Sequence, residues 1–207
     1  MITQIQKRSF WHRMNLIKRL SLLFSNRHLQ FLMIVSTCFT LAVDIFYEFG
    51  PVYLTVKWTL SPAQLVLYNG ILCLALAIGN GWLPVFISPR ISNRLAIMYA
   101  IGGFALLLIG MILTNSSIFM MLLFAFSGLA IGIAVTLITV KISNAAPENI
   151  QGEVMGVQLS LRVLGDALIC LFGGILLILS SKLILSVAAM ISLFSMVYYI
   201  YRNHARG

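Results

Sequence analysis

The stretch "SIFMMLLFAFSGLAIGIAVTLITV", residues 117–140, contains no charged side chain. An α-helix rises about 1.5 Å per residue, so a helix of this length spans the roughly 30 Å hydrocarbon core of a bilayer. Five further apolar stretches flank it, at 29–54, 64–87, 95–113, 154–179 and 183–201. We therefore expect an all-α polytopic membrane protein with six transmembrane helices.

The composition supports this class and argues against others. Of the 207 residues, 60% are hydrophobic and only 9% are charged, a balance that a soluble domain of this length cannot bury. The net charge of +9 lies mainly beside the apolar stretches and accompanies no nucleic-acid-binding motif, so we expect a lipid bilayer and no nucleic acid as partner. No phosphate-binding loop, metal cluster or nucleophile–base pair is visible, so we expect no enzyme, catalytic residue, cofactor or metal site.

The placement of the basic residues predicts the orientation. With six spans, both termini lie on the same side of the membrane. Lys57 and Lys182 are the basic residues outside the spans on the opposite side. The side of the termini collects Lys7, Arg8, Arg13, Lys18, Arg19, Arg27, Arg90, Arg94, Lys141, Arg202 and Arg206. The positive-inside rule then predicts a multi-pass protein of the cytoplasmic (inner) membrane with both termini in the cytoplasm.

Three regions follow from this pattern. Residues 1–28 form a basic amphipathic cytoplasmic segment, which suits either a helix on the membrane surface or a plain linker. Residues 29–201 form the six-helix transmembrane domain, and residues 202–207 form a cytoplasmic tail.

Charged side chains inside the spans are the first candidates for function. Asp44 and Glu48 lie in the first span, and Arg162 and Asp166 lie in the fifth. An ion at the bilayer centre costs about 2.5–3.5 kcal/mol on insertion scales, so such residues usually face a bundle interior or an aqueous cavity. A spacing of four places each pair on one helix face.

Two compatible interpretations remain open for these charges. In the structural one, Arg162 and Asp166 form a salt bridge within the fifth helix that lets it insert. In the functional one, Asp44 or Asp166 binds and releases a proton as the protein changes conformation, with Arg162 tuning its proton affinity by charge. Asn69 and Gln158 add uncharged polar groups, which either line a cavity or hydrogen-bond a neighbouring helix.

Glycines at a spacing of four indicate close helix packing. A Gly-x-x-x-Gly spacing lets two backbones approach each other, although it also arises by chance in glycine-rich spans. The candidates for helix packing are Gly128, Gly132, Gly152, Gly156, Gly173 and Gly174.

The stretch "PENIQGEVMGVQLSLRVLGDALICLFGG", residues 147–174, resembles the entry into the eleventh helix of the major facilitator superfamily. The resemblance is to the drug/proton antiporters of the tetracycline-exporter type. The loop "SPRISNR", residues 88–94, resembles a basic loop of the same family, and implies a latch-like role for Arg90 and Arg94. Here Pro89 stands where the family often has an acid, and Ser92 stands where it often has a glycine.

The resemblance covers residues from about 25 to 201 and implies half of a twelve-helix architecture. Family members have two six-helix halves with the substrate path between them. The chain resembles a carboxyl-terminal half, which implies secondary transport of a small molecule, as in drug or metabolite efflux coupled to protons. A second six-helix half or a second copy of the chain would then be needed.

Arg162 and Asp166 depart from the family pattern, which usually has uncharged residues there. The alternative is a non-transporting membrane fragment or assembly subunit derived from a truncated transporter. Substrate, transport direction and coupling ion stay open at this point.

Overall fold

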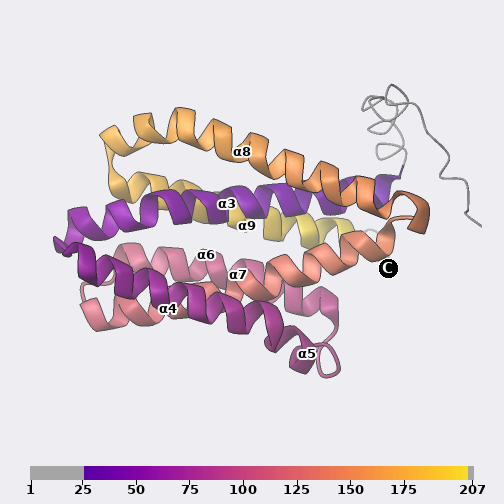
Figure 1. Ribbon diagram of the computed structural model, residues 1–207, viewed down its shortest axis with the longest axis horizontal. Helices are drawn as coiled ribbons and strands as arrows, with labels where there is room; N and C mark the ends of the chain where they lie inside the picture. The colour runs from indigo at the N-terminus through magenta and orange to yellow at the C-terminus, as the bar shows by residue number, and fades with distance from the viewer. Residues whose placement is uncertain (1–25, 205–207) are drawn as a thin grey trace, which may run out of the picture.

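The structure, a computed structural model, describes residues 26–204. Most of the basic segment at 1–28 and half of the tail at 202–207 thus lie outside the described residues. The helices are α3 (Arg27–Trp58), α4 (Pro62–Gly81), α5 (Leu83–Ile87), α6 (Asn93–Leu113), α7 (Ser117–Ala145), α8 (Gln151–Leu179) and α9 (Ser181–His204), with a 3-10 turn at Glu148–Ile150 (Figure 1). Six of them are long and apolar enough to cross a membrane, which confirms the all-α prediction with six transmembrane helices.

The second predicted span, 64–87, is wrong as a single helix. The chain leaves the helix at Trp82, between the end of α4 and the start of the short helix α5. Pro84 explains the break, because a proline ring has no N–H to donate and clashes with the carbonyl four residues earlier. The proline instead lies in the first turn of α5, where no N–H partner is needed.

Polar caps fix where the helices begin. The Ser61 hydroxyl accepts a hydrogen bond from the Gln64 backbone, and the Gln64 side chain accepts one from the Ser61 backbone, which together form a capping box. Ser92 and Ser116 cap α6 and α7 in the simpler way, with the hydroxyl accepting from the backbone N–H three residues on. These turn serines therefore set the lengths of the spans.

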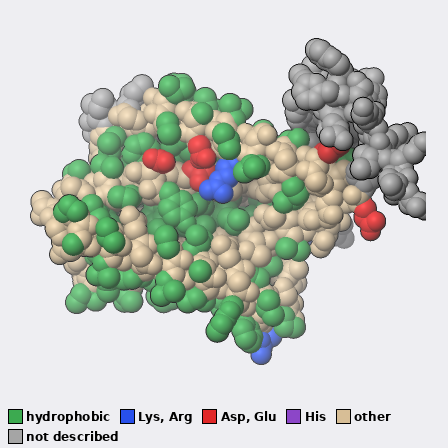
Figure 2. Space-filling view, viewed as in Figure 1, with side chains coloured by type: hydrophobic (Ala, Val, Ile, Leu, Met, Phe, Trp, Pro, Cys, Tyr) green, Lys and Arg blue, Asp and Glu red, His purple; other side chains and the backbone are tan. Residues whose placement is uncertain are grey.

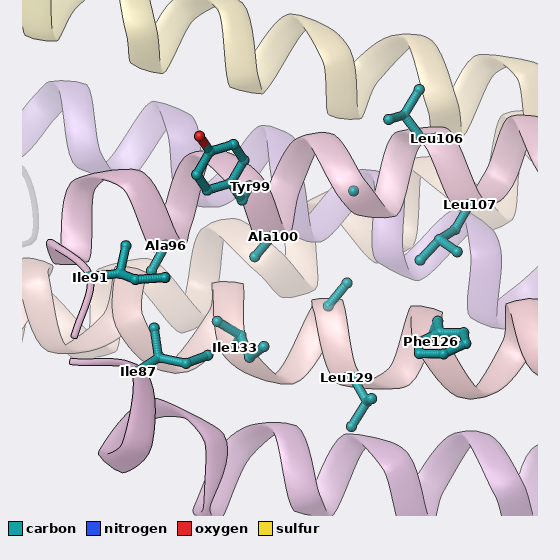
Figure 3. A pocket seen from close by; sticks show the side chains of 12 residues that line it. Ile87, Ile91, Ala96, Tyr99, Ala100, Leu106, Leu107, Phe126, Leu129 and Ile133 are labelled. Atoms are coloured by element: carbon teal, nitrogen blue, oxygen red, sulfur yellow. The ribbon is translucent and has the colours of Figure 1, made fainter. Parts of the chain in front are cut away.

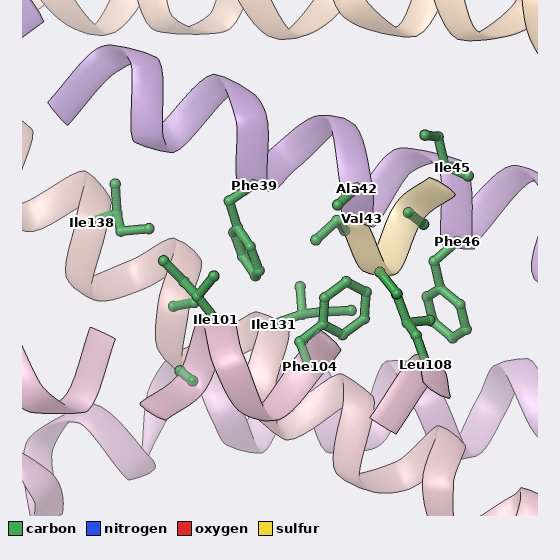
Figure 4. Close-up of a cluster of buried hydrophobic side chains, with 14 of the residues drawn as sticks. Phe39, Ala42, Val43, Ile45, Phe46, Ile101, Phe104, Leu108, Ile131 and Ile138 are labelled. Atoms are coloured by element: carbon green, nitrogen blue, oxygen red, sulfur yellow. The ribbon is translucent and has the colours of Figure 1, made fainter. Parts of the chain in front are cut away.

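Helix α3 is the most buried span of the bundle, and α4 and α8 are the most exposed. In Figure 1, α8 and α4 lie at opposite edges, with α3 and α7 between them. Phe39 and Phe46 of α3 both meet Phe104 of α6 edge-on, with ring centroids 5.7 Å apart in each pair (Figure 4). Such edge-to-face contacts add to dispersion packing, so α3 is fixed against α6 by a specific aromatic cluster.

The two ends of the bundle are held by different contacts. At one end, Phe31 near the start of α3 stacks on Tyr199 near the end of α9, with centroids 5.8 Å apart. At the other end, the Lys57 ammonium donates to the carbonyls of Ile112 and Thr114 at the end of α6. A cation suits the negative end of a helix, so Lys57 ties α3 to α6 there.

Helices α4 and α7 make the closest helix contact. A Cβ added at Gly128 would lie 2.5 Å from the Leu72 carbonyl oxygen, and one added at Gly132 would lie 2.7 Å from the Asn80 nitrogen. Gly79 faces the same contact from α4, where a Cβ would lie 2.7 Å from the Leu129 carbonyl oxygen. The absence of these side chains is what lets the two backbones touch.

We expect the substitution Gly132→Ala to destabilise the bundle, because its methyl group would meet α4 backbone that cannot rotate away. Overpacking of this kind costs about 1–3 kcal/mol, more than the gain in helix propensity of about 1 kcal/mol. Thermal unfolding of the detergent-solubilised protein measures the effect. Gly103→Ala is the matched control, since nothing lies within 4 Å of its Cβ position. Equal midpoints for the two variants would contradict the packing assignment.

Candidate functional site

Polar side chains run along the contact between α3 and α8 in steps of one helical turn. We call this set the α3–α8 polar ladder; it consists of Ser36, Thr40 and Asp44 on α3 and Gln158, Arg162 and Asp166 on α8. The Gln158 amide donates to the Ser36 hydroxyl at 2.8 Å, and the Arg162 guanidinium donates to Asp44 at 3.0 Å. Because residues four apart share a helix face, the two helices contribute matching rows of polar groups.

The ion pair of the ladder joins two helices. Arg162 Nη2 lies 3.0 Å from Asp44 Oδ1, whereas no ion pair joins Arg162 to Asp166 among the described residues. The salt bridge predicted within α8 is therefore wrong in its partner. Asp44 is only 6% exposed, and a buried carboxylate needs a counter-charge more than the part-exposed Asp166 does. Asp44 lies on the side of α3 that faces α8, so Arg162 pairs with Asp44 and not with Asp166.

Asp166 brings a second carboxyl group to this ion pair. It is near enough to interact with Asp44 electrostatically, as Arg162 does. When all three groups are ionised, the cluster carries one net negative charge in an apolar bundle. A single proton would neutralise it, so the cluster has the charge balance of a proton-binding site.

Several buried polar atoms at the ladder form no hydrogen bond with any described group. They are Asp44 Oδ2, Gln158 Oε1 and Tyr47 Oη. Buried polar atoms in folded proteins are nearly always paired, and those that are not often mark functional positions. All three atoms can accept a hydrogen bond, so the ladder can bind a proton or a donor group of a small molecule.

The structure places two other predicted path residues away from the ladder contacts. Glu48 lies one turn beyond Asp44 on α3 and is exposed, and Asn69 is exposed on α4. Neither makes a side-chain hydrogen bond or ion pair with another described residue. They would line a substrate path only if a further element covered the exposed sides of α4 and α8.

The sequence analysis missed three members of this neighbourhood: Ser36, Thr40 and Tyr47. The available signal was the row Ser36, Thr40, Asp44 and Glu48 at spacings of four, which places four polar groups on one face of the first span. Thr40 donates to the Ser36 carbonyl at 3.0 Å, as membrane-buried threonines commonly do.

The ladder lies beside the exposed sides of α4 and α8. Helix α3 contacts both α4 and α8, so the two exposed helices border the face of the bundle on which Arg162 is exposed. Figure 2 shows acidic and basic side chains together on this face, among apolar ones. The Arg162 side chain is 44% exposed there.

The glycines of α8 differ from those of α7. A Cβ at Gly152, Gly156 or Gly174 would meet nothing within 4 Å, so these residues pack against no other helix in the described part of the chain. Gly173 is different, because a Cβ there would run into the Phe49 ring of α3. The predicted packing role of the other three requires a partner outside this chain's described helices.

A separate hollow of about 510 Å³ lies between α6 and α7 and is almost wholly apolar (Figure 3). Ile87, Tyr99, Leu106 and Phe126 are among its lining residues. It holds no charged side chain, so it matches the hydrocarbon of a bilayer better than a charged or polar substrate.

The latch-like loop makes one local contact. Arg90 donates to the Phe86 carbonyl at 2.8 Å, at the end of α5. Arg94 lies in the first turn of α6 and forms no ion pair with a described residue. A latch role for both residues stays a prediction.

A family model described as Major Facilitator Superfamily matches residues 4–169, well over half of the chain. The chain belongs to the major facilitator superfamily. Membership agrees with six spanning helices arranged as one half of that fold, and it assigns the chain to membrane transport in general. No curated protein sequence matches the chain.

We expect Arg162→Gln to destabilise the bundle by about 1–3 kcal/mol, because Asp44 would stay buried without a counter-charge. The double substitution Asp44→Asn with Arg162→Gln removes both charges and should recover most of the loss. Thermal unfolding at neutral pH compares the variants, with Glu48→Gln on the exposed part of α3 as the control. A double variant no more stable than Arg162→Gln alone would show that the pair does not act through charge.

Proposed function

We propose that this six-helix unit is one half of a secondary transporter that moves a small molecule across the cytoplasmic membrane. The observation that carries the proposal is the α3–α8 polar ladder beside the exposed sides of α4 and α8. Transporter sites of this family lie near the bilayer midplane between the two halves. The position of the ladder near the middle of α3 and α8 supports this assignment.

A second six-helix half completes the path. Arg162 and Asp166 on an exposed helix would face hydrocarbon in the absence of a cover, which costs several kcal/mol. A second half placed against α4 and α8 would enclose these charges in a polar cavity. That half is either a separate amino-terminal-like unit or a second copy of this chain.

Proton coupling follows from the charge balance of the ladder. One proton neutralises Asp44, Arg162 and Asp166 together. The protein changes between its inward-facing and outward-facing states at lower cost when this cluster is neutral than when it is charged. We propose that the export of a drug or metabolite is coupled to the entry of this proton. Both termini lie in the cytoplasm in this arrangement, because Arg90, Arg94 and Lys141 share their end of the bundle.

Transport in vesicles tests the coupling. Inverted membrane vesicles containing the chain and its partner half should release protons when an exported compound is added, as read by a pH-sensitive dye. We expect Asp44→Asn and Asp166→Asn each to reduce this exchange at least tenfold, with Glu48→Gln close to the parent. Unchanged exchange in both aspartate variants would sink the assignment of the proton site.

Thiol oxidation in native membranes tests for the second half. Cys73 of α4 and Cys170 of α8 are both exposed on the helices that the partner should cover. A product of twice 23.0 kDa would identify a second copy, and another mass would identify a separate partner. Replacing both cysteines with serine should abolish either product. An uncrosslinked monomer under all conditions would favour the non-transporting fragment instead.

A further inference from the structure

A basic hollow lies at the end of the bundle that carries the termini, far from the polar ladder's ion pair. It has a volume of about 440 Å³ and lies between the start of α6 and the end of α9. Its lining residues are Ser92, Arg94, Leu95, Met98, Tyr199 and Ile200. The transport proposal uses none of them.

Arg94 lines this hollow, and a second cation, Lys141, is bound to Tyr199, another of its lining residues. The Lys141 ammonium of α7 donates to the Tyr199 hydroxyl at 2.9 Å and lies 5.1 Å from the centre of the same ring. Arg94 lines the same hollow as Tyr199, so both cations lie next to this tyrosine. Tyr199 therefore connects Lys141 to the hollow that Arg94 lines.

Neither cation has an acidic partner in the described part of the chain. The ion pair found there joins Arg162 to Asp44, on other helices and at another depth. The acidic residues that follow α7 in the chain are Glu148 and Glu153, and neither forms a salt bridge with Arg94 or Lys141. The loop at 88–93 contributes no carboxylate at all. A half-buried lysine beside an arginine calls for an external anion, since like charges at low dielectric destabilise each other.

The chemistry of the hollow selects a phosphate group on a lipid. An arginine guanidinium presents a planar fork of donors that matches phosphate, and a nearby lysine adds a point charge. Basic pockets between transmembrane helices are known places for anionic headgroups. Leu95 lines the hollow. Tyr99 and Leu106, which line the apolar hollow between α6 and α7, are exposed further along the same helix and offer a surface that an acyl chain can follow.

We propose that this hollow binds the phosphate headgroup of an anionic phospholipid, with Arg94 and Lys141 supplying the positive charge. The bound lipid neutralises the repulsion between the two cations and fastens the start of α6 to α7 and α9. The site is independent of the transport proposal, because it shares no residue with the polar ladder.

Lipid-dependent stability tests the site. The delipidated full-length chain is mixed with phosphatidylglycerol or phosphatidylcholine in detergent, and its thermal midpoint and bound lipids are followed by scanning fluorimetry and native mass spectrometry. We expect phosphatidylglycerol to raise the midpoint more than phosphatidylcholine does. Arg94→Gln should weaken phosphatidylglycerol binding about fivefold, since one basic residue near an anionic headgroup contributes about a factor of this size. Lys182→Gln, at the opposite end of the bundle, should leave the binding unchanged.

Charge reversal separates a specific site from general attraction. Arg94→Glu places a carboxylate beside Lys141, so the protein should become more stable in phosphatidylcholine than Arg94→Gln and lose its response to phosphatidylglycerol. Equal weakening by Lys182→Gln and Arg94→Gln would overturn the proposal in favour of nonspecific charge. Full stabilisation by inorganic phosphate alone would overturn the lipid assignment and leave a soluble phosphate as the ligand.

Discussion

The ion pair between Asp44 and Arg162 is the constraint on which the packing of α8 against α3 depends. A carboxylate that is 6% exposed inside a membrane bundle needs a counter-charge, and Arg162 of α8 supplies it at 3.0 Å. This requirement fixes the rotation of α8 about its axis. Gln158, Arg162 and Asp166 share this side of α8 with Gly165 and Gly173, which pack against Leu41 and Phe49 of α3.

The two contacts made by the exposed helices differ in kind. The six spans form two consecutive sets of three, α3–α4–α6 and α7–α8–α9. Because successive spans alternate in direction, the two sets have opposite orientations in the bundle, as expected for the inverted repeats within a half of this family. The contact of α4 with α7 corresponds to that of α8 with α3. Glycines bring the first pair into backbone contact. The second pair meets through side chains, both the polar ones of the ladder and Leu41 and Phe49 of α3, which pack on Gly165 and Gly173 of α8. Side-chain contacts can rearrange at lower cost than interlocked backbones, so we expect α8 to move more readily than α4.

The spans were predictable from the sequence because hydropathy alone decides which stretches enter a bilayer. The break at Trp82 could not be read from hydropathy, since the apolar run continues through Pro84. The residues of the candidate site were also largely predictable, because charge inside a span is rare. Their pairing was not. A spacing of four favours a bond between Arg162 and Asp166, and only the rotation of α3 in the folded bundle brings Asp44 closer.

The glycine spacings show the same limit. Gly128 with Gly132 and Gly152 with Gly156 have identical patterns, yet the first pair touches α4 and the second meets nothing in the described chain. The spacing indicates that another helix can approach closely, and whether a neighbouring helix lies there depends on the fold.

Thiol crosslinking between α3 and α8 tests the central claim most directly. Ser36→Cys and Gln158→Cys replace two side chains whose polar atoms lie 2.8 Å apart, in a chain whose Cys38, Cys73 and Cys170 are changed to alanine. The account predicts that a short bifunctional thiol reagent, which spans the length lost on shortening Gln158, converts the protein in membranes to an internally crosslinked monomer. A pairing of Ser36→Cys with Thr136→Cys, on α7, should not crosslink. Absence of the α3–α8 crosslink, or a product of dimer size alone, would contradict the ladder.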